Sequence, residues 1–91
     1  MELIDINGRN FAMTKKGKWA LIFWVPWGKP SSDQIGLAKK NLQKSRRFAL
    51  VNAEENRDIS MEYNILIYPT TVFLDCGIEE RRVVGLHGVI K

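Results

Sequence analysis

One unbroken apolar run, Trp19 to Trp24, sets the strongest limit on what this chain can fold into. Six consecutive apolar residues without polar alternation are typical of a central β-strand that is covered on both faces. The run is far too short to span a membrane. The sequence therefore predicts a sheet with helices packed against both of its sides.

The segments around this run alternate between strand-like and helix-like patterns. The expected strands cover residues 2–6, 19–24, 48–52, 71–74 and 81–84. The expected helices run from Asn7 or Asn10, as a cap, to about Lys16, from about Pro30 past Ala38, and over residues 58–64. Gly17 is expected to end the first helix, and residues 75–79 are typical of a hairpin turn. The order is β-α-β-α-β-α-β-β, which predicts an α/β protein with a central mixed sheet flanked by helices.

Size and composition fit one folded domain over residues 1–91. Hydrophobic residues make up 45% of the chain, which is enough to fill a core and argues against disorder. Fourteen basic and ten acidic side chains give a net charge of +4, which by itself is a statement about solubility. The first residues have neither the basic nor the apolar region of a signal peptide, so we expect a cytoplasmic protein.

The apolar run leads into residues 23–31, which read Phe-Trp-Val-Pro-Trp-Gly-Lys-Pro-Ser, and residues 68–71 read Tyr-Pro-Thr-Thr. Together these two segments resemble the active site of the thioredoxin family. In that family a strand ending in Phe-Trp leads to Trp-Cys-Gly-Pro-Cys, and an Ile-Pro-Thr with a cis proline faces the loop. The resemblance covers nearly the whole chain and implies a thioredoxin-like fold.

Both cysteines of the family's dithiol are replaced here, because Gly28 stands at the first position and Ser31 at the second. Disulfide exchange needs a thiolate that attacks and a second thiol that resolves the mixed disulfide. Glycine has no side chain, and the pKa of a serine hydroxyl is far too high for it to act as a thiolate would. We therefore do not expect dithiol–disulfide oxidoreductase activity.

Two further positions agree with this loss. The resemblance places Ile22 where the family carries a buried aspartate, and Leu50 near the position of a lysine that assists proton transfer at the dithiol. A buried charged pair is costly to maintain, and its replacement by apolar groups is often neutral or stabilising. Absence of the thiols together with absence of their proton relay predicts a redox-inactive, non-catalytic protein.

The retained residues indicate binding instead of catalysis. The resemblance implies a shallow groove that holds an extended peptide against the main chain of the residue before the cis proline. The candidate groove residues are Trp24, Trp27, Gly28, Lys29, Pro30, Ser31, Tyr68, Pro69 and Gly85. An exposed Trp27 would be a typical contact residue at such a groove. The alternative is that Trp24 and Pro69 only hold the loop and the core together.

The end of the chain departs from the family pattern. After Gly85 only residues 86–91 follow, which are too few for the family's final helix over one face of the hairpin. Either the final helix is trimmed from this chain or one sheet face is left partly uncovered, and an uncovered apolar face favours a partner. We expect a protein or peptide partner, or a second copy docked on that face, and no membrane.

Two alternative functions rest on other residues. Cys76, the one cysteine, lies at the predicted hairpin turn and could act as a redox thiol with a partner's thiol. A basic cluster could bind nucleic acid or another anion, although no aromatic RNA-binding motif accompanies it. That cluster consists of Lys39, Lys40, Lys44, Arg46 and Arg47. Its simpler interpretation is a solvated face that complements the helix dipole. His87 is the single histidine, so we expect neither a metal site nor a cofactor.

Overall fold

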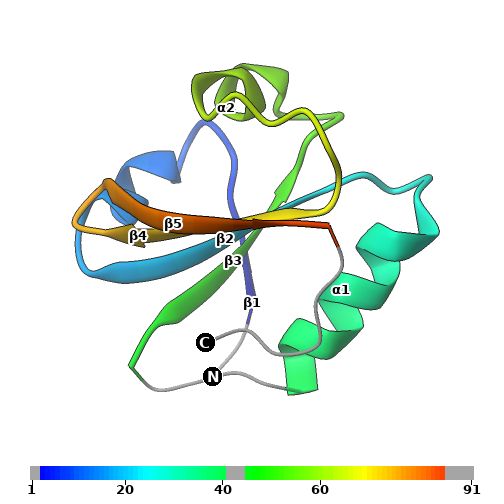
Figure 1. Cartoon of the computed structure of the whole chain (residues 1–91). Helices are drawn as coiled ribbons and strands as arrows, with labels where there is room; N and C mark the ends of the chain where they lie inside the picture. The colour runs from blue at the N-terminus through cyan, green and yellow to red at the C-terminus, as the bar shows by residue number, and fades with distance from the viewer. Residues whose placement is uncertain (1–2, 41–44, 86–91) are drawn as a thin grey trace.

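The computed structural model describes residues 3–40 and 45–85, apart from the side chains of residues 29–31. The elements follow in the order β1 (Leu3–Asp5), η1 (a 3-10 helix, Phe11–Lys15), β2 (Lys18–Trp24), α1 (Lys29–Lys40), β3 (Arg47–Asn52), α2 (Arg57–Glu62), β4 (Thr70–Asp75) and β5 (Ile78–Val84). This order confirms the predicted α/β architecture (Figure 1). β5 is longer than the expected strand over residues 81–84, because pairing with β4 resumes directly after the turn at residues 76–77.

The five strands form one mixed sheet in the order β1-β3-β2-β4-β5. β1, β3 and β2 run parallel to one another, whereas β4 is antiparallel to β2 and β5 is antiparallel to β4. β2 is therefore the central strand, as the apolar run predicts, and the five residues from Trp19 to Phe23 are all fully buried. The parallel half of the sheet puts the carboxyl ends of β1, β3 and β2 at one edge, where α/β proteins usually carry a site.

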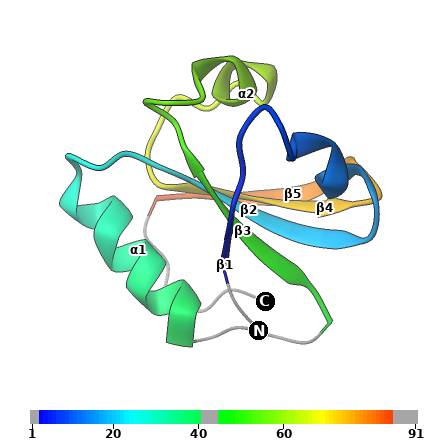
Figure 2. The same cartoon turned by 180° about the vertical axis from the view of Figure 1, so that it is seen from behind.

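Helical segments cover both faces of this sheet, with α2 and η1 on one side and α1 on the other (Figures 1 and 2). On the α2 face, Ile59 of α2 joins Leu21 and Phe23 in one apolar cluster. On the α1 face, Ala38 of α1 joins Ile22 in a second cluster. Alternate residues of a strand point to opposite faces, which is why a continuously apolar β2 serves both clusters.

The first helical segment is shorter than the sequence predicts, since only five residues form a 3-10 helix. The predicted side-chain cap is wrong for Asn10: it holds the cap position, but its Nδ2 donates to the Asp5 carbonyl at 2.8 Å instead. Asn7 Oδ1 accepts from the Arg9 amide at 2.8 Å. These bonds fold the β1–η1 turn back on itself. Gly17 follows with a φ of +79°, which confirms its predicted place just past the end of the segment.

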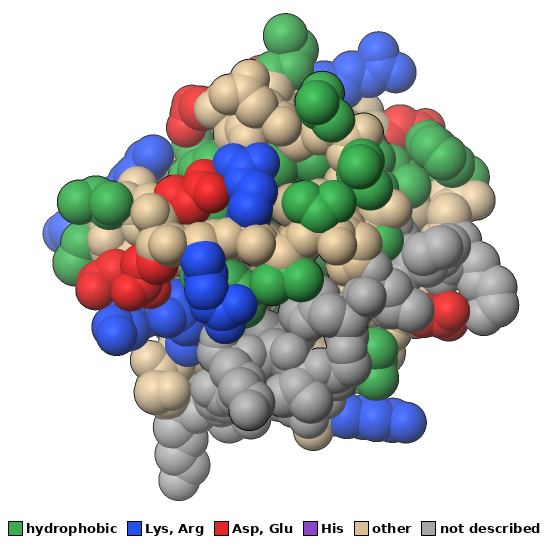
Figure 3. Space-filling model, viewed as in Figure 1, with side chains coloured by type: hydrophobic (Ala, Val, Ile, Leu, Met, Phe, Trp, Pro, Cys, Tyr) green, Lys and Arg blue, Asp and Glu red, His purple; other side chains and the backbone are tan. Residues whose placement is uncertain are grey.

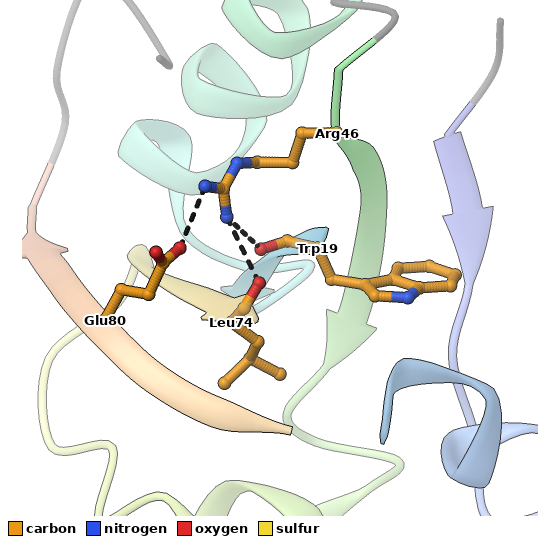
Figure 4. A network of polar contacts seen from close by, with 4 residues as sticks. All are labelled: Trp19, Arg46, Leu74 and Glu80. Atoms are coloured by element: carbon orange, nitrogen blue, oxygen red, sulfur yellow. Dashed lines mark hydrogen bonds and ion pairs between the residues drawn. The ribbon is translucent and has the colours of Figure 1, made fainter. Parts of the chain in front are cut away.

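Arg46 ties three strands together at the end of the sheet opposite the site (Figure 4). Its Nη1 donates to the carbonyls of Trp19 at 2.8 Å and of Leu74 at 3.3 Å, and its Nη2 pairs with Glu80 at 2.9 Å. The guanidinium also lies 5.1 Å from the centroid of the Phe73 ring. Its side chain is only 12% exposed. Arg46 therefore satisfies backbone groups of the fold, and a ligand has little access to it.

A partly uncovered sheet face is one of the two alternatives left by the sequence, and around β4 the sheet face is covered. Phe73 of β4 is 1% exposed, and the guanidiniums of Arg46 and Arg81 lie over its ring. The prediction about the final helix falls on residues 86–91, which lie outside the described residues. Within residues 3–40 and 45–85, no helix is both long enough and apolar enough to cross a membrane.

Candidate functional site

The loop between β2 and α1 forms one wall of the candidate site. The Gly28 amide donates to the Val25 carbonyl at 3.3 Å, and the Gly28 carbonyl accepts from the Ser32 amide at the same distance. Gly28 therefore lies immediately before the first turn of α1, which contains Lys29, Pro30 and Ser31. The side chains of those three candidate residues lie outside the described part of the structure. This is the place at a helix N-terminus where a thiol would be activated, and Gly28 leaves it without a functional group.

The second wall is built around the Tyr68–Pro69 peptide bond, which is cis. Pro69 is buried, and its carbonyl accepts a hydrogen bond from the Gly85 amide at 2.7 Å. Gly85 has a φ of +86°, in the left-handed region that favours glycine. On the other side, Thr70 Oγ1 donates to the Ile67 carbonyl and closes the turn into β4. These bonds hold the half-buried Tyr68 in place beside the loop.

A groove of about 550 Å³ lies between the β2–α1 loop, α2 and the segment that leads into β4. This volume falls within the usual range of ligand pockets, about 300 to 1,000 Å³. The lining residues are Val25, Trp27, Ala53, Glu54, Arg57, Ser60, Met61, Ile65 and Tyr68. The structure thus brings Trp27 and Tyr68, two of the residues predicted from sequence, to the same groove.

Large apolar side chains at and beside this groove are exposed to solvent. Trp27 and Met61 line the groove and are each 75% exposed. Leu66 and Ile67, just before Tyr68, are 89% and 56% exposed. In Figure 3, hydrophobic side chains gather over the segment between α2 and β4. Exposed apolar groups that cluster beside a concave surface are typical of an interaction site.

Trp24 lies elsewhere. It follows Ile22 by two residues in β2, so both side chains face α1, and Trp24 lines a separate hollow of about 350 Å³ with Asp5, Leu50 and Asn52 among its walls. Its indole Nε1 is buried and has no hydrogen-bond partner among the described residues. The structure therefore separates the two tryptophans that the sequence analysis groups in one site.

The two positions at which the family carries a charged pair hold apolar side chains in this chain. Ile22 of β2 and Leu50 of β3 are paired residues of neighbouring strands. Ile22 is fully buried and Leu50 is half-buried, and both belong to the apolar cluster on the α1 face. There is accordingly no carboxylate at position 22 and no ammonium at position 50.

Cys76 lies at the far end of the sheet from the groove. It occupies the turn between β4 and β5 with a φ of +52°, is exposed, and its amide donates to the Gly17 carbonyl at 2.9 Å. The six residues of β4 separate it from Pro69, and at about 3.3 Å per residue this is roughly 20 Å. Figure 1 shows the β4–β5 turn and the β2–α1 loop on opposite sides of the molecule. The Cys76 thiol cannot reach a segment bound beside Tyr68.

The basic cluster is not one continuous surface. Lys39 and Lys40 are exposed at the end of α1, whereas Arg46 is held inside the sheet end and Arg47 lies 4.7 Å from the Trp19 ring centroid. Lys44 and His87 lie outside the described residues. In the part of the chain that the structure describes, no three His, Cys, Asp or Glu side chains converge as a metal site would need.

The α2 wall of the groove is the part that the sequence analysis missed. Arg57, Ser60 and Met61 lie at the spacing i, i+3 and i+4, which places them on one face of the helix. The approach to α2 is set by Asn52, whose Oδ1 accepts from the amides of Glu54 and Glu55 at 3.0 and 3.3 Å. The helical spacing of an exposed methionine with two polar residues was the available signal.

These features define a class of protein. A mixed five-stranded sheet with helices on both faces and a cis proline beside the β2–α1 loop is the thioredoxin-like fold. The chain superposes on the thioredoxin Mala s 13 of Malassezia sympodialis with a TM-score of 0.87 and 23% identity, over 96% of this chain and 82% of that one. It superposes on a mutant thioredoxin of Halobacterium salinarum with a TM-score of 0.83 and 21% identity, over 94% and 80%. At these identities the likeness shows the fold alone.

A curated relative adds evidence from the sequence. The chain is 32% identical over 66 residues to a thioredoxin of Mycoplasma genitalium, which is 69% of this chain and 64% of that relative. The match therefore spans slightly less than two thirds of the relative's length. No protein-family model matches the chain. The chain thus has the thioredoxin-like fold and is similar in sequence to a thioredoxin over part of that protein's length.

Proposed function

We propose that this chain is a cytoplasmic, non-catalytic thioredoxin-like module that binds an extended segment of a protein partner between Trp27 and Tyr68. The observation that carries the proposal is the exposure of Trp27, which is 75% open to solvent in a groove of about 550 Å³. Large aromatic side chains in this situation are enriched among the residues that dominate binding energy.

The chemistry of the groove supports binding without disulfide exchange. Gly28 carries no nucleophile before the first turn of α1, and the one thiol of the chain, Cys76, is at the opposite end of the sheet. A thiol–disulfide cycle needs an attacking and a resolving thiol within reach of the same substrate. A bound segment in this groove meets neither.

The main chain at Tyr68 supports an extended conformation for the bound segment. The Tyr68 amide and carbonyl form no hydrogen bond with the described residues, although the neighbouring Pro69 carbonyl is bonded to Gly85. Such unpaired backbone groups can hold an incoming strand by main-chain hydrogen bonds. Two main-chain bonds at Tyr68 would fix the register of the segment, and the side chains of the groove would select its residues.

The side chains of the groove favour an apolar centre in the bound segment. Trp27 and Met61 present apolar surface, and Ile65 closes the floor at 7% exposure. Glu54 and Arg57 lie on the same lining and carry opposite charges. A segment with one or two bulky apolar residues, flanked by charged residues of either sign, would match both the apolar and the charged side chains of the lining.

The test is a selection followed by a mutational comparison. A library of random seven-residue peptides displayed on phage is selected on the wild-type protein, and the selected peptides are synthesised and titrated. We expect Trp27→Ala to weaken binding at least tenfold. The matched control is Ile78→Ala, since Ile78 is 73% exposed but lies at the start of β5, away from the groove. Selected peptides that bind both variants equally well would overturn the proposal.

A further inference from the structure

β5 is the edge strand of the sheet, and among the described residues no strand pairs with its outer side. Figure 3 views the molecule from this edge, and acidic and basic side chains gather over β5. Large apolar residues stand at both ends of the strand, where Ile78 is 73% and Val84 is 53% exposed. An unpaired edge of seven residues is a template for another strand.

The order of charges along β5 complements itself. The strand reads Ile-Glu-Glu-Arg-Arg-Val-Val over residues 78–84. The bulge at Glu80 puts Glu80 and Arg81 on the same face, since Arg81 and the Arg46 partner of Glu80 both lie over the Phe73 ring. When two copies run antiparallel about a point between these two residues, Glu80 of each copy therefore lies opposite Arg81 of the other. Glu79 then lies opposite Arg82, so that all four charged residues of each copy meet the opposite sign. Opposite charges that face each other across antiparallel strands stabilise the pair.

The same register also gives the apolar residue at the start of the strand a neighbour. It places Ile78 of one copy opposite Val83 of the other, so each exposed Ile78 gains an apolar neighbour. We infer that two copies of this chain associate through β5, in antiparallel register centred between Glu80 and Arg81, and join their sheets into one. The inference is independent of the groove and does not rest on the proposed function.

The residues of β5 lack two common means of blocking an edge strand, proline and lysine. Its two acidic and two basic residues cancel, so they do not repel a second copy of the same strand. A β-bulge at Glu80 is the one protective feature that β5 retains. Within one copy Glu79 already pairs with Arg82 at 2.8 Å, with side chains about a third exposed, and Glu80 pairs with Arg46. These contacts hold the carboxylates at the edge, where they can be shared with a second copy.

The association is expected to be weak. One strand pair buries less area than the roughly 1,200 Å² of a standard stable interface. In addition, the register between β4 and β5 shifts between Phe73 and Leu74, which leaves Glu80 as an extra residue and increases the local twist. We therefore expect a weak dimer. In a series of samples that spans a hundredfold range of protein concentration, it should be detected only in the most concentrated ones.

The test uses two charge variants of the edge. In the first, Glu79→Arg and Glu80→Arg make the edge wholly basic, and in the second, Arg81→Glu and Arg82→Glu make it wholly acidic. Sedimentation velocity across that concentration range should show a concentration-dependent dimer for the wild type. Each variant alone should remain a monomer, and an equimolar mixture of the two should dimerise.

The second variant also removes the hydrogen bond that Arg82 donates to the Tyr63 carbonyl at 2.9 Å, which lowers its stability. The mixture of the two variants controls for this loss. Recovery of the dimer in the mixture requires that both variants fold. A wild type that stays monomeric, a mixture that stays monomeric, or variants that dimerise alone would each overturn the inference. Trp27→Ala should dimerise like the wild type, which separates this result from that of the groove.

Discussion

Ile22 and Leu50 are paired residues of the neighbouring parallel strands β2 and β3, and both belong to the apolar cluster on the α1 face. The resemblance to thioredoxins puts a carboxylate and an ammonium at these two positions. In this chain the pair is an apolar contact within the cluster under α1. The apolar pair in the core therefore supports the proposal that this site binds without catalysing disulfide exchange.

Ile22, the buried member of this pair, should not tolerate replacement by a charged residue. Ile22 is fully buried, so Ile22→Asp should lower the free energy of unfolding by about 3–5 kcal/mol. Ile22→Val, as the control, should cost about 0.5–1.5 kcal/mol. Leu50→Lys should cost less than Ile22→Asp because the half-buried chain can carry its ammonium to the surface. Urea denaturation of the three variants gives these values.

The double variant Ile22→Asp/Leu50→Lys should lose less stability than the sum of the two single losses, because the two charges meet across the strands. Two outcomes would contradict the apolar pairing of β2 with β3. One is a double variant whose loss of stability equals the full sum of the two single losses, and the other is an Ile22→Asp variant as stable as Ile22→Val.

Arg46 and Arg47 are adjacent in sequence but should differ sharply in their effect on stability. Arg46→Met leaves two strand carbonyls and Glu80 without their shared donor, so a loss of about 2–4 kcal/mol is expected. Arg47→Met removes an exposed guanidinium that lies over the Trp19 ring, and about 0.5–1 kcal/mol is expected. Thermal and urea unfolding of both variants check the difference. Equal losses would mean that the Arg46 contacts at the sheet end contribute little.

The Glu79–Arg82 pair should make part of the stability depend on pH. The hydrogen bond from Arg82, with the arginine's charge, holds the pKa of Glu79 below its ordinary value. A depressed pKa contributes stability that is present above the ordinary glutamate range and is lost as pH falls through the lowered value. Glu79→Gln should therefore lower Tm at pH 7, by the equivalent of less than about 1 kcal/mol. The difference should vanish at a pH below the lowered pKa.

The control for this pH effect is Glu54→Gln, which replaces an exposed carboxylate on the groove, away from the β5 edge. Its effect on Tm should not follow the pH dependence of Glu79→Gln. Calorimetric scans of wild type and both variants between pH 7 and strong acid make the comparison. A Glu79→Gln difference that grows as the pH falls would have the wrong sign and refute the pairing.

The position before α1 should still activate a thiol if one is supplied. In a Cys76→Ser background, Gly28→Cys places a thiol just before the first turn of the helix, where backbone amides and the helix dipole stabilise the thiolate. We expect iodoacetamide to alkylate this cysteine at neutral pH several-fold faster than it alkylates Cys76 in the wild type. A slower reaction at position 28 would show that the helix start does not retain the geometry of a thiol site.

Much of the fold follows from sequence because its strongest signals are local. The apolar run in β2, the turn at Cys76 and Gly77, and the segment around Pro69 each specify one feature, and together they leave few alternatives. The first helix is harder to predict, since Asn7 and Asn10 each offer a capping side chain but use it to close the β1–η1 turn. Nothing in the residue types distinguishes these two uses.

The candidate site was only partly predictable. Trp27 and Tyr68 come from the two segments that carry the resemblance, and they meet in one groove. Trp24 shares the parity of Ile22 in β2, so its separation from Trp27 could have been read from the period of two. Arg57 and Met61 of the α2 wall have a helical spacing in the sequence, but the position of a six-residue helix over the sheet is set by tertiary packing.

The central claim is that the groove binds an extended segment through the main chain of Tyr68. The most direct measurement is amide hydrogen exchange by NMR, with and without a saturating peptide from the phage selection. We expect that the Tyr68 amide, which has no partner among the described residues of the free protein, becomes strongly protected and that amides around Trp27 and Met61 shift. Protection elsewhere on the surface, with Tyr68 exchanging as fast as before, would contradict it.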